Sequence, residues 1–231
     1  MTVVATFPPL YPVSLSVEGR PCLVVGGGPV AARKATGLVE CGAVVAVVAP
    51  SMVPAFEELC RHSAELPGSV VLERRPYRDG EAGRYRLVVT ATGVPEVDHR
   101  VAEDAEAAGV WVNCADDAEH CTFQLPSIHR DGPVCIAVST GGSSPALATW
   151  LRQRAGAAVG PNLGLLAALL DEARHRLQDA GKPTEGVDWQ ALLDGDLPRL
   201  VGEGRLDEAR AMLGRATTGE SRGPQAAERR R

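Results

Sequence analysis

Apolar positions along the first half of the chain follow two alternating patterns, short β-branched runs and longer stretches with helical spacing. The short runs predict strands at Pro21–Val25, Val44–Val48, Ser69–Arg74, Leu87–Ala91 and Val110–Cys114. The longer stretches predict helices at Val30–Glu40, Met52–Glu65 and Pro95–Ala108. Strands that alternate with helices are typical of a parallel sheet covered on both faces. We therefore expect an α/β fold.

The pattern changes after one more short run, Pro133–Ser139, which predicts a sixth strand. Ser144 is a favourable N-cap, and Pro145 suits the first position of a helix. The apolar spacing that follows predicts this helix over Ala146–Val159.

The C-terminal part is predicted to be entirely helical. Leucine and alanine recur at helical spacing over Pro161–Ala180 and Asp188–Leu213. These broad apolar faces exceed what one edge of a parallel sheet usually covers, so we expect a homodimer. Arg215–Arg231 has no apolar periodicity and five arginines against two glutamates, which predicts a disordered tail.

Composition and charge narrow the class of protein. The 231 residues include 24 Lys and Arg against 29 Asp and Glu, a net charge of −5, which argues against a general nucleic-acid surface. No apolar run approaches the roughly 18 residues that a membrane helix needs, and the first residues do not resemble a signal peptide. We expect a cytoplasmic protein without nucleic-acid or membrane partners.

Six cysteines are scattered along the chain without a CxxC pair. They show no Cys/His cluster with zinc-like spacing, so the sequence predicts no metal site. We interpret all six as small buried apolar residues.

A glycine-rich turn provides the first candidate binding site. Gly26, Gly28 and Ala31 occupy the three defining positions of a G-x-G-x-x-A motif, directly after a predicted strand and at the start of a predicted helix. In a Rossmann-type sheet such a loop brings the pyrophosphate of a dinucleotide onto backbone N–H groups at the helix N-terminus. The alternative is a glycine turn without a ligand.

The usual ribose-binding carboxylate is missing from the second predicted strand, which runs into Ala49-Pro50-Ser51. Backbone groups or the Ser51 hydroxyl would have to hold the ribose, so the choice between NAD and NADP is weakly specified. Thr90-Ala91-Thr92-Gly93 ends the fourth predicted strand with small residues, which leave room for a cofactor or form a simple loop.

Carboxylates follow the fifth predicted strand, where ligands bind in open α/β sheets. Asp116 or Asp117 could act as a general base there, although a turn or helix cap is the alternative. We interpret His120 and His129 as loop residues. A second loop rich in hydroxyls and glycine, Ser139–Pro145, precedes a helix N-terminus and suits an anion or ordinary capping.

Taken together, the motifs resemble the precorrin-2 dehydrogenase family, which includes the dehydrogenase/ferrochelatase part of sirohaem synthase. The resemblance covers about Tyr11 to Arg154 in unbroken order. It rests on the segments CLVVGGGPVAARKATGL, AVVAPS, LVVTATG, VNCADDAEHCTFQLPSI and CIAVSTGGSSPALATWLR. Cys114-Ala115 departs from the valines common in the family.

The resemblance implies NAD-dependent oxidation of precorrin-2 to sirohydrochlorin, and in some members insertion of Fe²⁺. The family's key aspartate falls on Asp116, with Asp117 as the neighbour to test beside it. Its cofactor contacts fall on Gly26, Gly28, Pro29, Val30, Ala31, Pro50 and Ser51, and the end of the fourth predicted strand adds Thr92 as a cofactor contact. Substrate contacts would fall on Asn113, Thr140 and Ser143.

The resemblance also suggests a division of the chain and a set of cationic contacts. We expect a NAD-binding Rossmann domain over 1–115, a dimerisation and active-site segment over 116–154, a helical C-terminal domain over 155–214 and the tail over 215–231. The polyanionic tetrapyrrole would find candidate partners in Arg33, Lys34, Arg130, Arg152 and Arg154. The alternative function is a non-catalytic NAD-sensing module.

Overall fold

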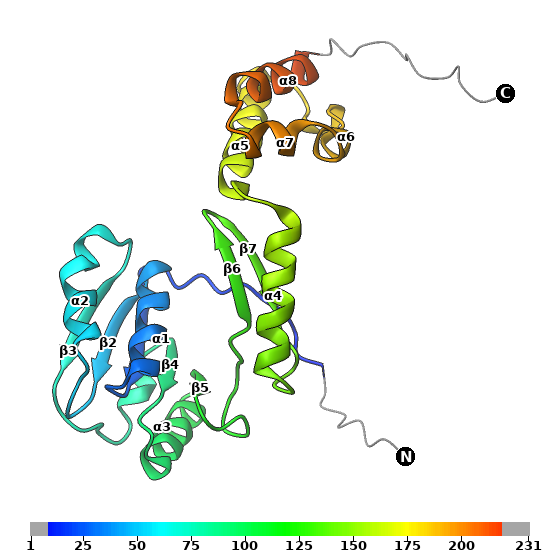
Figure 1. Cartoon of the computed structure of the whole chain (residues 1–231). Helices are drawn as coiled ribbons and strands as arrows, with labels where there is room; N and C mark the ends of the chain where they lie inside the picture. Colours follow the sequence, from blue (N-terminus) through cyan, green and yellow to red (C-terminus); the bar gives the residue numbers. More distant parts are fainter. Residues whose placement is uncertain (1–8, 219–231) are drawn as a thin grey trace, which may run out of the picture. The chain divides into compact units, whose positions relative to one another are not determined.

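The computed structural model describes residues 9–218 and groups the chain into two compact units (Figure 1). The first unit comprises the residues up to Leu125 together with Gly141–Ser143. The second comprises Pro126–Thr140 and the residues from Ser144 onward. The main boundary between them therefore falls inside the predicted 116–154 segment.

A five-stranded parallel sheet forms the centre of the first unit, in the order β3-β2-β1-β4-β5. Its strands are β1 (Pro21–Val25), β2 (Val44–Val48), β3 (Ser69–Glu73), β4 (Leu87–Thr90) and β5 (Trp111–Cys114). Its helices are α1 (Pro29–Glu40), α2 (Ala55–His62), η1 (Ser63–Glu65), η2 (Glu81–Arg84) and α3 (Pro95–Ala107). This doubly wound order confirms the predicted fold class, and the carboxyl ends of β1 and β4 meet at the switch point of the sheet.

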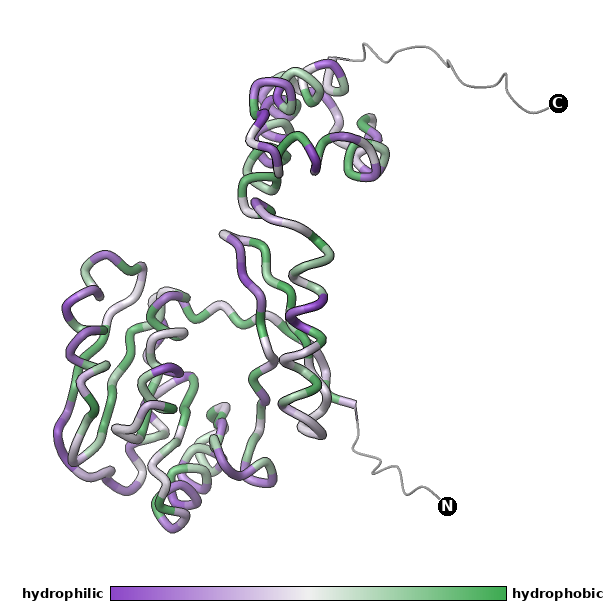
Figure 2. Tube along the Cα trace, viewed as in Figure 1, coloured by the Kyte–Doolittle hydropathy of each residue, from purple (hydrophilic) through white to green (hydrophobic). Residues whose placement is uncertain are grey.

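Alternate residues of the central strand enter two separate cores. Cys22 and Val24 pack with α1 and α2 on one face of the sheet. Leu23 and Val25 pack with α3 on the other. The strands accordingly appear as apolar stretches in the hydropathy view (Figure 2). Burial on both faces holds the sheet rigid and so fixes the loops at its carboxyl edge.

The second unit begins with a hairpin of β6 (Ser127–Asp131) and β7 (Val134–Val138), which packs against α4 (Pro145–Val159). Ser144 caps α4 as predicted, since its hydroxyl accepts a hydrogen bond of 3.2 Å from the Leu147 N–H. The sequence did not reveal β6, because its residues SIHRD contain a single aliphatic side chain.

Four further helices, with the short η3 (Thr184–Gly186), complete the described part of this unit: α5 (Leu163–Asp179), α6 (Trp189–Asp194), α7 (Leu197–Gly202) and α8 (Leu206–Thr218). They share one core that includes Leu169, Leu197 and Leu213. The stretch with helical spacing over Asp188–Leu213 forms three helices, because Gly195 and Gly204 interrupt it and Gly204 adopts a φ of +74°.

The predicted start of the tail is also wrong, since α8 continues to Thr218. The rest of that predicted tail lies outside the described residues. Within residues 9–218, no helix has the length and apolar character required to cross a bilayer.

Candidate cofactor and active site

The turn between β1 and α1 is built from glycines because its backbone touches two other loops. Gly26 has a φ of +133°, and a Cβ there would lie 2.3 Å from the Ala91 carbonyl oxygen. A Cβ on Gly27 would lie 1.7 Å from the Ser51 carbonyl oxygen. Around Gly28, by contrast, a Cβ would meet no described atom within 4 Å. Two glycines therefore close the turn, and the third leaves backbone exposed to a ligand.

A pocket of about 440 Å³ opens at this turn, at the carboxyl ends of β1, β2 and β4. It brings together five predicted cofactor residues: Gly26, Gly28, Pro50, Ser51 and Thr92. Pro76, Tyr77, Val94 and Val97, which the sequence did not single out, complete much of the wall.

The other three predicted cofactor residues lie in the first turn of α1. Pro29 and Val30 are exposed, and Ala31 is fully buried in the core between helix and sheet. The first turn of α1 contains no acidic side chain, and no side chain caps it. Its N–H groups and the helix dipole therefore suit an anion beside Gly28.

Asp98 holds the loop that forms the β4 side of the pocket. Its side chain is buried, and its Oδ1 accepts a hydrogen bond from the Thr90 hydroxyl and one of 3.1 Å from the Thr92 N–H. The Thr92 hydroxyl in turn accepts a hydrogen bond of 3.0 Å from the Val94 N–H. Asp98 thus positions Thr92. The sequence had indicated only that Asp98 lies in the first turn of a predicted helix.

The end of the pocket near Tyr77 is apolar. The Tyr77 hydroxyl donates a hydrogen bond of 2.8 Å to Asp104 and accepts one of 3.1 Å from the Ala82 N–H. Burial, reinforced by Asp104, raises the pKa of this phenol well above its usual range. Nearby, the carboxylates of Glu73 and Glu81 pair with Arg75. Because the Tyr77 hydroxyl is already hydrogen-bonded to Asp104 and Ala82, Tyr77 contributes an apolar wall to the pocket.

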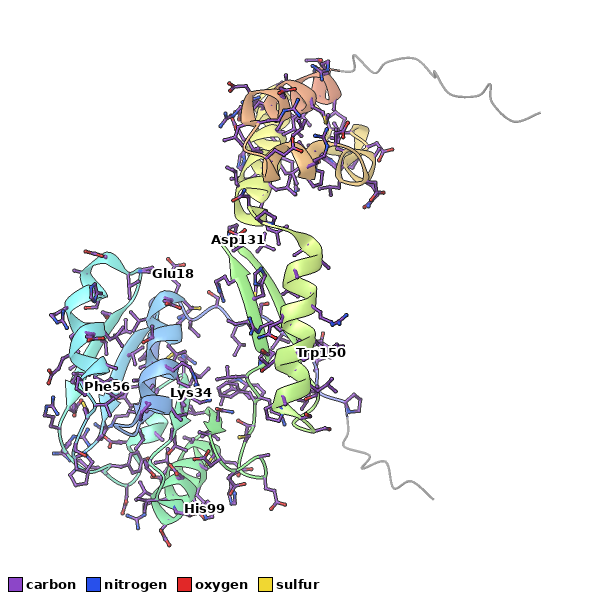
Figure 3. All side chains as sticks on the ribbon, viewed as in Figure 1. Glu18, Lys34, Phe56, His99, Asp131 and Trp150 are labelled. Atoms are coloured by element: carbon purple, nitrogen blue, oxygen red, sulfur yellow. The ribbon has the colours of Figure 1, made fainter. Side chains whose placement is uncertain are left out.

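Lys34 joins the Rossmann helix α1 to the end of β5 (Figure 3). Its ammonium group donates a hydrogen bond of 2.8 Å to Asn113 Oδ1, and Asn113 Nδ2 donates one of 3.1 Å to the Phe123 carbonyl. Burial and the nearby Arg33 lower the pKa of Lys34, while Asp116 is among the groups that oppose this shift. Asn113, predicted to bind substrate, is buried within this network.

In the loop after β5, the side chains of the adjacent residues Asp116 and Asp117 have different surroundings. Asp116 is exposed, and its charge acts on Lys34. Asp117 is half-buried and faces His99 and His120. Cys121 organises the loop, because its thiol lies 3.1 Å from the carbonyl oxygens of both Cys114 and Asp117.

Four residues predicted to contact the substrate lie in the second unit: Arg130, Thr140, Arg152 and Arg154. The Thr140 hydroxyl donates to the Ser144 carbonyl at 3.1 Å and accepts from the Ser144 N–H at 3.2 Å, which stabilises the start of α4. The Arg154 guanidinium lies 4.5 Å from the centre of the Trp150 ring. Arg130 is exposed and Arg152 is half-buried. Ser143, grouped with the first unit, is exposed.

Comparison with known proteins identifies two matching family models. Residues 13–127 match a family described as "Putative NAD(P)-binding", and residues 131–154 match the central part of sirohaem biosynthesis proteins. The sirohaem synthase of Acinetobacter baylyi is 34% identical over 207 residues, covering 88% of this chain and 44% of that protein. The sirohaem synthase of Thioalkalivibrio sulfidiphilus is 37% identical over 210 residues, covering 89% and 42%. The chain thus spans less than half the length of these relatives.

The fold also matches a solved structure. SirC, a precorrin-2 dehydrogenase, superposes with a TM-score of 0.67 at 23% sequence identity. The match covers 88% of this chain and 100% of that one.

Proposed function

We propose that the chain belongs to the family of sirohaem synthases and precorrin-2 dehydrogenases, and that it oxidises precorrin-2 to sirohydrochlorin with NAD⁺. One observation carries this proposal. A dinucleotide-type pocket with open backbone at Gly28 lies at the same sheet edge as the exposed carboxylate of Asp116.

The residues around the glycine turn fit a dinucleotide. The space beside Gly28 would admit the pyrophosphate, and the N–H groups at the start of α1 would bind it. Ser51 and the backbone around Pro50 would contact the adenosine ribose, and the Asp98-held loop with Thr92 would line the other side. Bound NAD⁺ supplies the chemistry of a hydride acceptor.

Asp116 would accept the proton. Oxidation of precorrin-2 to sirohydrochlorin removes two electrons, as one hydride to NAD⁺ and one proton to a base. Asp116 is exposed and can pass this proton to water. The Lys34 ammonium donates a hydrogen bond to Asn113 on β5, three residues before Asp116, and so holds the strand end that carries the base. Lys34 is thus a positioning residue for the base.

Metal insertion and dimer formation extend the proposal. Fe²⁺ would enter sirohydrochlorin as a substrate, and two macrocycle protons would leave.

In the second unit, α5–α8 bury their apolar faces in one core, so the predicted reason for a homodimer does not apply to them. Helix α4 instead exposes Leu147, Trp150, Leu151 and Val159, and we assign the dimer contact to this helix.

A non-catalytic NAD-sensing module is the second candidate. It is favoured by Asn113 and Thr140, because both predicted substrate contacts are engaged in hydrogen bonds within the chain. It predicts NAD⁺ binding without turnover of a tetrapyrrole.

Anaerobic incubation with precorrin-2 and NAD⁺, followed by tetrapyrrole absorbance, separates these functions. We expect sirohydrochlorin and NADH in equal amounts from the wild type. Asp116→Asn should lower kcat about 100-fold or more, and Asp207→Asn, an exposed aspartate on α8, should not. NAD⁺ binding without sirohydrochlorin would refute the dehydrogenase and leave the sensing module.

A further inference from the structure

Three potential metal ligands converge beside the candidate catalytic loop. His99 comes from α3 (Figure 3), and Asp117 and His120 come from the loop after β5. His99 Nε2 lies 2.9 Å from Asp117 Oδ2, and His120 Nδ1 lies 2.7 Å from the same oxygen. All three ligand atoms lie within 4.8 Å of one another.

The spacing suits a single ion. Ligands bound to a transition metal at about 2.1 Å lie roughly 3.0–3.4 Å apart when adjacent in octahedral or tetrahedral geometry. The two measured separations from Asp117 Oδ2 are slightly shorter, so small side-chain rotations would admit the ion. Two imidazoles and one carboxylate are a ligand set used for divalent first-row metals.

The surrounding structure already orients these ligands. Asp117 Oδ1 accepts a hydrogen bond of 3.0 Å from the Glu119 N–H, which leaves Oδ2 directed between the imidazoles. The Cys121 thiol lies 3.1 Å from the Asp117 carbonyl. The imidazole rings of His99 and His120 stack with centroids 4.2 Å apart and an interplanar angle of 19°. The loop thus holds the three side chains together, and rotation of the imidazole rings would direct both nitrogens at one ion.

The site is also charged and accessible. The side chains of His99, Asp117 and His120 are 41%, 28% and 37% exposed, so an ion can enter from solvent. Asp117 Oδ2 faces a nitrogen of each imidazole, and a carboxylate oxygen is a ligand for divalent cations.

We propose that His99, Asp117 and His120 bind one divalent first-row transition-metal ion. Asp117 directly follows Asp116, so the ion would be held in the same loop as the proposed proton acceptor. We assign the bound ion as the one inserted into sirohydrochlorin, where it replaces two N–H protons. This role rests on the proposed function, whereas binding of the ion does not.

Co²⁺ is the probe that tests the site, because its visible absorption reports its ligands. The full chain, stripped with a chelator, should bind one Co²⁺ with a spectrum typical of nitrogen and oxygen ligands. His99→Ala, His120→Ala and Asp117→Asn should each weaken binding about 100-fold or more, since each removes a direct ligand. His62→Ala is the matched control, because His62 is an exposed helical histidine on α2, and it should leave affinity unchanged.

Clear results would overturn the proposal. The site is refuted if the wild type fails to bind Co²⁺, or if the three variants bind it as tightly as the wild type. A sulfur-to-cobalt charge-transfer band would also refute it, because a cysteine thiolate would then be a ligand. Circular dichroism and NAD⁺ affinity of each variant verify that the fold persists.

The two proposals fail separately. Loss of precorrin-2 oxidation with normal Co²⁺ binding removes the dehydrogenase and retains the metal site. The insertion role predicts that His120→Ala slows Co²⁺ insertion into sirohydrochlorin at low Co²⁺ and that saturating Co²⁺ restores the rate. An undiminished rate at low Co²⁺ would refute this role.

Discussion

Gly28→Ala should separate cofactor binding from folding. Gly28 has φ −85° and ψ 178°, which any residue adopts, and an added Cβ would meet no described atom within 4 Å. The entropic gain of about 0.4–1 kcal/mol from Gly→Ala is offset by the weaker capping of alanine. The free energy of unfolding should therefore change by less than about 1 kcal/mol.

The same methyl group should strongly weaken cofactor binding. It would occupy the space through which a pyrophosphate approaches the backbone. Loss of two hydrogen bonds to a charged group, at about 1.5 kcal/mol each, amounts to about 3 kcal/mol, or roughly a 100-fold higher Kd for NAD⁺. Isothermal titration calorimetry measures the Kd, and thermal unfolding measures the Tm.

Two further glycines provide matched controls for this experiment. Gly37→Ala in α1 meets no described atom within 4 Å, so it should raise the Tm slightly and leave NAD⁺ affinity unchanged. Gly27→Ala would place a Cβ 1.7 Å from a backbone oxygen, so it should lower the Tm. If Gly28→Ala keeps both the Tm and the wild-type NAD⁺ affinity, the pyrophosphate does not bind beside Gly28.

Lys34→Met should lower kcat about tenfold, because it removes the hydrogen bond to Asn113 that holds the strand end carrying Asp116; an unchanged kcat in stopped-flow assays would contradict this role. Asp98→Ala should lower the free energy of unfolding by about 2 kcal/mol, since it leaves buried donors without their acceptor, and urea titration measures the loss. Burial opposes ionisation of Glu81, yet the hydrogen bonds from Arg75 lower its pKa in the folded state. The pair therefore stabilises the fold fully above a pH of about 4.5, the pKa of an unperturbed glutamate. This stabilisation is lost as the pH falls through the lower pKa of folded Glu81. Arg75→Ala should therefore cost about 2 kcal/mol at neutral pH, and a deficit in Tm that fails to shrink in acid would contradict this.

The sheet of the first unit could be predicted because its signals are local. Each predicted strand there matches the structure to within one residue at each end, since each is marked by a short run that contains valine, and β1, β2 and β4 are largely buried. The glycine turn was also predictable, because its motif combines a strand, a turn and a helix in one segment. The exception was Gly27, whose close approach to Ser51 depends on another loop.

The rest of the candidate site depends on contacts between distant segments. Lys34 and Asn113 meet although 79 positions separate them, and His99 and Asp117 are 18 positions apart. Neither residue of such a pair carries a local pattern that distinguishes it from a solvated surface charge. Single-sequence reasoning therefore placed Asp116 and Asp117 after a strand, left the choice between them to the family resemblance, and did not predict which side chains they contact.

The position of β1 at the centre of the sheet has a consequence for folding during synthesis. This strand leaves the ribosome before the other four strands of its sheet, but it pairs with β4, where Cys22 lies opposite Leu87. The second core face of β1 cannot be covered until α3 has also emerged. β1 therefore remains an apolar strand with an unpaired edge until most of the first unit has been synthesised. Such exposure favours slow folding and aggregation, and chaperone assistance to nascent chains would relieve it.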